Sequence, residues 1–150
     1  MWSAAHWQTA TRPAGIGARL AVAVMPNRVL IVDPHAAFRS ASKALLQTEG
    51  LEIVAALETY EGVVELTIDL RPDVALIDVS LHRPEGLDLA RRLASLSEPP
   101  AIVLMSAASP ETILAASVGA RAFVPKANLT ADVIAHVAGA SREREEVRCS

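Results

Sequence analysis

Four polar residues of this chain stand at or just after the ends of short apolar runs, and their types suit one kind of chemistry. They are Asp33, Asp78, Ser106 and Lys126. A carboxylate can act as the nucleophile that accepts a phosphoryl group, and a second carboxylate can hold Mg²⁺ through oxygen. A hydroxyl can donate a hydrogen bond to a phosphoryl oxygen, and an ammonium group can neutralise its charge. Brought together, these four side chains would form a phosphoryl site.

The elements that must position these residues alternate regularly from residue 28 onward. Short β-branched runs predict strands, and the longer stretches between them carry apolar residues at helical spacing. The predicted strands are 28–32, 51–56, 74–77, 101–105 and 122–124, and the predicted helices are 36–48, 60–70, 86–96, 110–118 and 131–140. Uninterrupted apolar strands alternating with helices predict an α/β fold with a parallel sheet covered on both faces. Right-handed crossovers then favour a doubly wound, five-stranded parallel sheet with the flavodoxin-like strand order 2-1-3-4-5.

The predicted sheet explains why the four polar residues should meet. In open parallel sheets the ligand crevice lies beyond the carboxyl ends of the strands. Each residue also has an ordinary structural explanation, because an aspartate after a strand commonly caps a turn and a lysine there is commonly solvated. Their joint occurrence at four strand ends favours the phosphoryl site.

Composition narrows the function classes further. The chain has 150 residues, enough for one domain with a real core, and a formal net charge of −3 without a dominant basic block. Nucleic-acid binding needs clustered Lys and Arg, so we expect no direct nucleic-acid partner. Its single cysteine, Cys149, cannot form an internal disulfide, and no apolar run is long enough to span a bilayer. We therefore expect a cytoplasmic protein without a membrane partner.

The two ends of the chain differ from its middle. Residues 1–27 contain no acidic residue and are expected to be a disordered leader, with Met25 as the natural start. Residues 28–140 form the predicted domain. Residues 141–150 are charged and are expected to be a fraying tail, with no output domain after it.

Five segments of the chain resemble the response regulator receiver domains of two-component signalling. The segments are 29–39, 71–79, 81–87, 102–107 and 119–126, and the resemblance runs in order from about residue 28 to about residue 138. It implies that Asp78 is the phosphoacceptor and that Lys126 binds the phosphoryl group. It also implies that Ser106 is the hydroxyl that moves toward the phosphoryl group, and that Phe123 is the aromatic that swings inward with it.

The metal site implied by the resemblance departs from the family pattern at one position. Asp33 matches the first of two adjacent acids, Asp78 is the second metal ligand, and Ser80 matches the position that lends Mg²⁺ a backbone carbonyl. Pro34 stands where the family has its second acid. Proline supplies no carboxylate, so we expect weakened Mg²⁺ binding and slower phosphoryl transfer.

The resemblance implies a single-domain response regulator, a phosphoacceptor rather than a turnover enzyme. Its partners would be a sensor histidine kinase or phosphotransfer protein and a downstream protein target. A homodimer through the fourth helix, fifth strand and fifth helix is a further implied contact. Because of Pro34, a phosphorylation-independent pseudo-receiver that binds other proteins stays open as an alternative. A hydrolase using Ser106, His35 and Asp78 is disfavoured, because no serine lies in a G-x-S-x-G turn.

Overall fold

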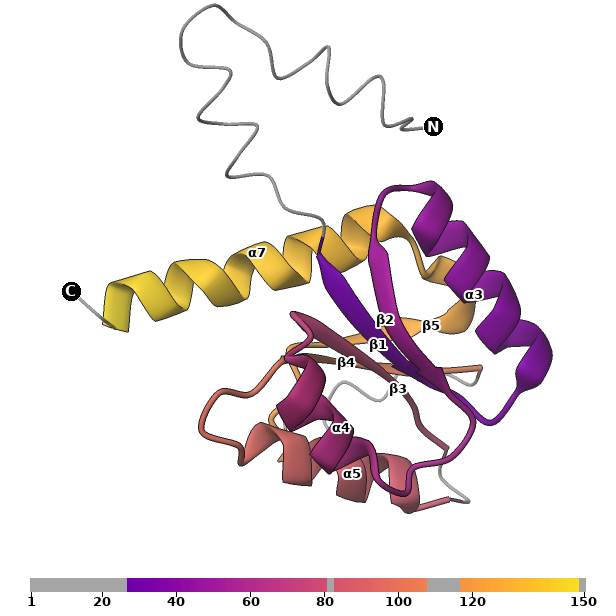
Figure 1. Cartoon of the computed structure of the whole chain (residues 1–150), viewed down its shortest axis with the longest axis horizontal. Coiled ribbons are helices and arrows are strands. Elements are labelled where there is room, and N and C mark those ends of the chain that lie inside the picture. The colour runs from indigo at the N-terminus through magenta and orange to yellow at the C-terminus, as the bar shows by residue number, and fades with distance from the viewer. Residues whose placement is uncertain (1–26, 81–82, 108–116, 149–150) are drawn as a thin grey trace, which may run out of the picture.

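Buried aliphatic runs form a five-stranded parallel sheet in the order β2-β1-β3-β4-β5, which confirms the predicted fold class (Figure 1). The computed structural model describes residues 27–80, 83–107 and 117–148. In chain order the elements are β1 (Arg28–Val32), α3 (Ala36–Thr48), β2 (Glu52–Leu57), α4 (Val63–Leu70), β3 (Val74–Asp78), α5 (Glu85–Ala94), β4 (Ala101–Ser106), β5 (Ala122–Pro125), the 3₁₀ turn η1 (Lys126–Asn128) and α7 (Ala131–Arg148).

Helices cover the sheet from both sides, α3 and α7 on one face and α4 and α5 on the other (Figure 1). Alternation along β1 shows how the sequence divides between the two layers. Val29 and Ile31 pack toward the α3–α7 layer, and Leu30 and Val32 pack toward the α4–α5 layer. All four are fully buried. Because every second residue of a strand faces the same side, a strand buried on both faces needs an unbroken apolar run.

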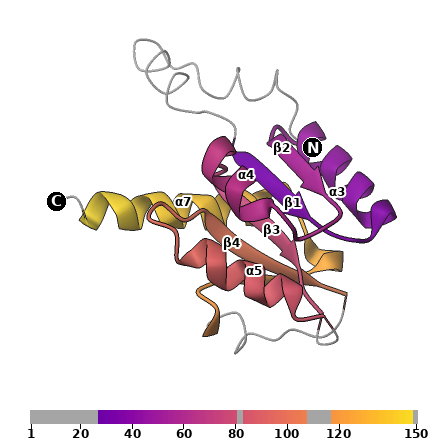
Figure 2. The ribbon, with the colours of Figure 1, turned by 60° about the horizontal axis from the view of Figure 1, so that its bottom comes forward.

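Two predicted helix boundaries are wrong by more than two residues. Helix α4 begins at Val63 rather than at residue 60, because Gly62 precedes it in a left-handed conformation with φ of 74°. Helix α7 does not end at residue 140 but continues to Arg148, so the charged segment 141–148 is helical. Arginine and glutamate both have good helix propensity, which accounts for the extension. Figure 2 shows the end of α7 reaching beyond the sheet.

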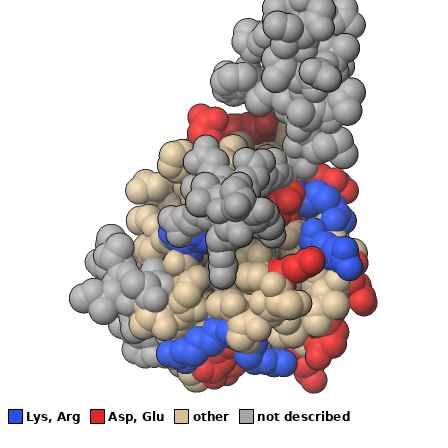
Figure 3. Space-filling model, turned by 90° about the vertical axis from the view of Figure 1, so that its left-hand side faces the viewer, with Lys and Arg blue, Asp and Glu red and all other residues tan. Residues whose placement is uncertain are grey.

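Some predictions fall outside the described residues. The expected leader at 1–27 lies there except for Asn27, and so does most of the helix predicted at 110–118. Within the part that the structure describes, no helix is long and apolar enough to cross a membrane. Figure 3 views the side of the molecule on which α7 ends, where basic and acidic side chains are interspersed along the lower and right-hand margins.

Candidate functional site

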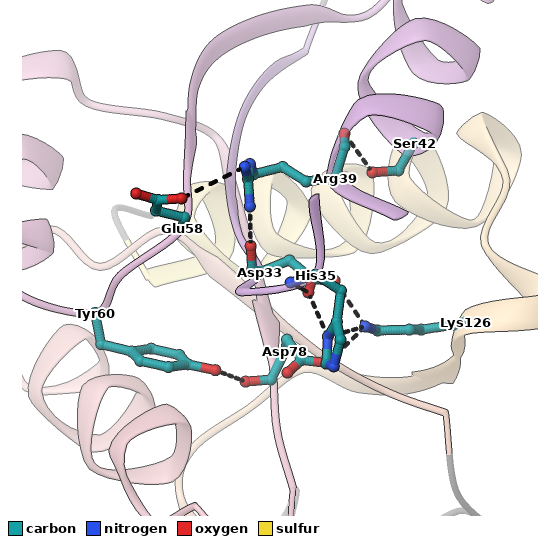
Figure 4. Close-up of polar contacts among 8 residues, drawn as sticks. All are labelled: Asp33, His35, Arg39, Ser42, Glu58, Tyr60, Asp78 and Lys126. Atoms are coloured by element: carbon teal, nitrogen blue, oxygen red, sulfur yellow. Dashed lines mark hydrogen bonds and ion pairs between the residues drawn. The ribbon is translucent and has the colours of Figure 1, made fainter. Parts of the chain in front are cut away.

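The candidate site lies at the carboxyl ends of β1 and β3, called here the carboxyl edge (Figure 4). These strands are neighbours, and Val32 pairs with Ile77 at the end of their shared register. Asp33 and Asp78 each follow the paired residue of their strand and therefore lie side by side. Asp33 is fully buried and Asp78 is 4% exposed. Two carboxylates in so little water require a compensating cation, because burying an unpaired charge is costly.

Lys126 supplies that cation from the turn after β5. Its Nζ lies 2.7 Å from Asp33 Oδ2 and 2.8 Å from Asp78 Oδ1. Asp33 Oδ2 accepts no well-angled hydrogen bond from the described residues, so the ammonium is its charge partner. The same ammonium stands 4.4 Å from the centre of the Phe38 ring, a cation–π contact from α3. These distances bring together three of the four residues predicted to converge, namely Asp33, Asp78 and Lys126.

His35 closes the site on the α3 side, immediately before that helix begins. Its backbone N–H donates to Asp33 Oδ1 at 2.8 Å, and its ring Nδ1 lies 2.9 Å from the same oxygen. The ring Nδ1 also lies 3.3 Å from Lys126 Nζ. Figure 4 shows the imidazole against the carboxylates and the ammonium. The sequence placed His35 only in the disfavoured hydrolase and not in the phosphoryl site, although its position two residues after Asp33 was the available signal.

Two side chains hold the main-chain carbonyls of the two aspartates. Arg39 Nη1 donates to the Asp33 carbonyl at 2.7 Å, and Arg39 Nη2 also lies 3.8 Å from Glu58 Oε2. The Tyr60 hydroxyl donates to the Asp78 carbonyl at 2.9 Å. Burial raises the pKa of this hydroxyl well above its usual range, and the negative charges of Asp78 and Asp33 raise it further. Tyr60 therefore stays a hydrogen-bond donor through the neutral range.

Gly86, in the first turn of α5, packs against the same carbonyl. A Cβ added at this position would lie 2.5 Å from the Asp78 carbonyl oxygen and 3.1 Å from Val79 Cγ1. Real Cβ atoms do not approach backbone oxygen this closely. Glycine is thus required at this position for α5 to close on the end of β3.

The remaining predicted site residues surround this centre. Ser106 ends β4 beside Pro125, the residue before Lys126, and is 9% exposed. Phe123 is half-buried and packs with the α4–α5 layer. Ser80 forms a short antiparallel bridge with Arg83, whose N–H donates to the Ser80 carbonyl at 3.2 Å.

The donors present fit a divalent cation. Ligand atoms of Asp33, His35 and Asp78 all lie within 4.8 Å of one another. Carboxylate oxygens are the ligands that Mg²⁺ takes from proteins, usually one or two of them beside water. Asp33 and Asp78 supply two, and Pro34 leaves the third position without a carboxylate. An arriving cation must share or displace the contacts of the Lys126 ammonium.

Comparisons with known proteins agree on one family. The family model for the response regulator receiver domain matches residues 29–138. The transcriptional regulatory protein PdtaR of Mycobacterium tuberculosis is 34% identical over 113 residues, which are 75% of this chain and 55% of PdtaR. A protein-glutamate methylesterase/protein-glutamine glutaminase of Myxococcus xanthus is 37% identical over 93 residues, 61% of this chain and 27% of that protein. This chain thus spans about half or less of these relatives.

Solved structures show the same fold. The signal receiver domain of NarL from Mycobacterium tuberculosis superposes with a TM-score of 0.67 at 26% identity, over 77% of this chain and 98% of that domain. A CheY-like receiver domain protein from Methanospirillum hungatei gives a TM-score of 0.66 at 22% identity, over 81% of this chain and 98% of that one.

Proposed function

This chain belongs to the response regulator receiver domains of two-component systems, and we propose that Asp78 accepts a phosphoryl group from a histidine kinase or a phosphotransfer protein. The observation that carries the proposal is the placement of Lys126. Its ammonium contacts both buried carboxylates at the carboxyl edge, at 2.7 and 2.8 Å. Buried carboxylates paired to one ammonium in this way are typical of functional sites rather than of surface ion pairs.

In the proposed reaction, a carboxylate oxygen of Asp78 attacks the phosphorus of a phosphohistidine. The new O–P bond makes an aspartyl phosphate, and the P–N bond breaks, so that the nitrogen keeps its electron pair and takes a proton. The Lys126 ammonium neutralises charge on the phosphoryl oxygens. Arg39 and Tyr60 keep the two strand ends in place through the main-chain carbonyls. Asp33, Asp78 and the Ser80 carbonyl would hold Mg²⁺, which shields the negative charges of nucleophile and phosphoryl group.

The output of the proposed reaction is a change of a protein-binding face. The Ser106 hydroxyl would donate to a phosphoryl oxygen, and Phe123 would move further inward from its half-buried position. Phe123 lies in β5, next to η1 and the start of α7. A downstream protein, or a second copy of the chain, would read the face around β5 and α7.

A second function is favoured by one observation, the proline at position 34. In a pseudo-receiver the Lys126 ammonium would serve as the permanent counterion of Asp33 and Asp78. Such a chain would bind its partner without phosphorylation.

Incubation with acetyl phosphate, with and without Mg²⁺, separates the two functions. Intact-mass spectrometry should show one added phosphoryl group that depends on Mg²⁺ and is absent from Asp78→Asn. Absence of any adduct at millimolar Mg²⁺, in a folded protein, would favour the pseudo-receiver.

A further inference from the structure

Pro34, the position without a carboxylate, is followed by His35, and the ring of this histidine points into the site. His35 Nδ1 lies 2.9 Å from Asp33 Oδ1, and the His35 backbone N–H donates to the same oxygen at 2.8 Å. The imidazole is thus held close to the carboxylate on which a metal would depend. Its side chain is 64% exposed, so the ring reaches the pocket from the solvent side and can adjust to a ligand.

The three candidate ligand atoms form a mixed nitrogen and oxygen set. Asp33, His35 and Asp78 offer two carboxylate oxygens and one imidazole nitrogen, all within 4.8 Å of one another. Imidazole suits Zn²⁺, Co²⁺, Ni²⁺ and Fe²⁺, whereas Mg²⁺ takes oxygen ligands. One imidazole with two carboxylates is a donor set that leaves positions open for water or a phosphoryl oxygen.

We propose that this site prefers a divalent transition metal over Mg²⁺, with His35 Nδ1 as the ligand that replaces the missing carboxylate. The proposal deepens the proposed phosphoacceptor function and rests on it for the use of the metal, but not for the binding. With a metal bound, the proton of the imidazole would sit on Nε2, so that the Nδ1 lone pair faces the cation.

Lys126 opposes the binding of a metal ion. Its Nζ lies 3.3 Å from His35 Nδ1 and within 2.8 Å of both carboxylates, so the ammonium occupies the place that a metal would approach. The metal must therefore compete with this cation, and Lys126→Met should raise the affinity for any divalent ion. The choice between metals, by contrast, depends on the imidazole.

The test measures Zn²⁺ and Mg²⁺ binding by calorimetry on the full chain in a Cys149→Ser background, which removes the thiol as a competing ligand. Co²⁺ absorption serves as a second reading, since its visible spectrum reports nitrogen coordination. We expect tighter binding of Zn²⁺ than of Mg²⁺. We also expect His35→Gln to weaken Zn²⁺ binding by about tenfold or more, the scale known for changes around metal ligands, and to leave Mg²⁺ binding unchanged.

Three controls assign the effect. His136→Gln removes an exposed histidine on α7 and should alter neither metal. Asp78→Asn should weaken the binding of both metals. Pro34→Asp should strengthen Mg²⁺ binding and so reduce the preference for Zn²⁺ over Mg²⁺. Zn²⁺ affinity equal in wild type and His35→Gln, or a wild-type preference for Mg²⁺, would overturn the proposal. Acetyl phosphate labelling of Asp78 tests the proposed function separately, so labelling without a His35 effect would refute only the metal preference.

Discussion

Charged side chains at the two ends of the sheet are in opposite surroundings. At the amino ends of the strands, called here the amino edge, Arg28 lies 3.7 Å from Glu52, with side chains 37% and 53% exposed. At the carboxyl edge, Lys126 lies within 2.8 Å of Asp33 and Asp78, with side chains 11%, 0% and 6% exposed. Water therefore screens the charges of Arg28 and Glu52. It screens the charges of Lys126, Asp33 and Asp78 much less.

The burial of the carboxylates differs as well: Glu52 is exposed and Asp73 is partly exposed, whereas Asp33 and Asp78 are buried. At the amino edge the Arg28 backbone N–H also donates to Asp73 Oδ2 at 2.8 Å, which ties the starts of β1 and β3 together. At the carboxyl edge one ammonium faces two buried carboxylates. An excess negative charge in a site with little water is suited to binding a cation and the group that it accompanies. Similar residue types thus form exposed contacts at one edge and a buried charge cluster at the other.

Of the substitutions considered at the two edges, Lys126→Met should cause the largest loss of stability. Two buried carboxylates would then face each other, and removing one partner of a buried ion pair costs about 3 kcal/mol or more. We expect the free energy of unfolding at neutral pH, measured in urea, to fall by that amount. Adding Asp33→Asn should restore most of the loss. An unchanged midpoint in the single variant would show that the carboxyl edge is as well screened as the amino edge.

Replacing Gly86 with alanine should have the next largest effect. Its Cβ would meet the Asp78 carbonyl oxygen at 2.5 Å, and forced overpacking costs about 2 kcal/mol. The matched control is Gly139→Ala in α7, where a Cβ meets nothing within 4 Å and should instead stabilise the helix by up to about 1 kcal/mol. Equal effects of the two changes on thermal unfolding would contradict the close contact at β3.

Tyr60→Phe should cost about 1 kcal/mol, because it removes one hydrogen bond to the Asp78 carbonyl. The pKa of Tyr60 is raised in the folded state, so the folded chain keeps this proton at a pH where the unfolded chain loses it. Stability contributed by Tyr60 is therefore complete below about pH 10 and lost as pH rises above it. Urea titrations from pH 8 to 11 should show a steeper alkaline loss in wild type than in Tyr60→Phe. Parallel curves would mean that the hydroxyl is not held as described.

The smallest effect should come from the amino edge. Glu52→Gln removes the exposed partner of Arg28, and exposed pairs contribute about 0.5 kcal/mol or less. We expect a change of that size in urea, which disappears at high salt. A loss comparable with that of Lys126→Met would remove the distinction between the two edges.

The fold could be predicted from the sequence because every strand except β2 contains an unbroken apolar run that leads into a polar residue. The same feature placed Asp33, Asp78 and Lys126 at one edge, and their contacts follow from the strand order. The boundary of α7 was missed because its last two turns are charged, and a charged segment at the end of a chain looks like a tail. Its helix-forming arginines and glutamates were the signal that predicted otherwise.

Other parts of the site had no such signal. Arg39 and Tyr60 act on main-chain carbonyls of residues 6 and 18 positions away, and such contacts depend on where loops lie rather than on residue type. Gly86 is required because of the distance between α5 and the end of β3, which periodicity does not give. His35 was within reach of sequence reasoning, since it follows the proline that replaces a carboxylate. Its ring orientation, however, required the structure.

Locating the phosphoryl label on the chain tests most directly whether Asp78 is the residue that accepts it. After treatment with acetyl phosphate and a divalent metal, reduction with borohydride converts an aspartyl phosphate to homoserine, which peptide mass spectrometry assigns to a position. We predict homoserine at residue 78, its loss in Asp78→Asn, and its persistence in Asp73→Asn at the amino edge. Homoserine at another aspartate, or equal labelling of wild type and Asp78→Asn, would contradict the account.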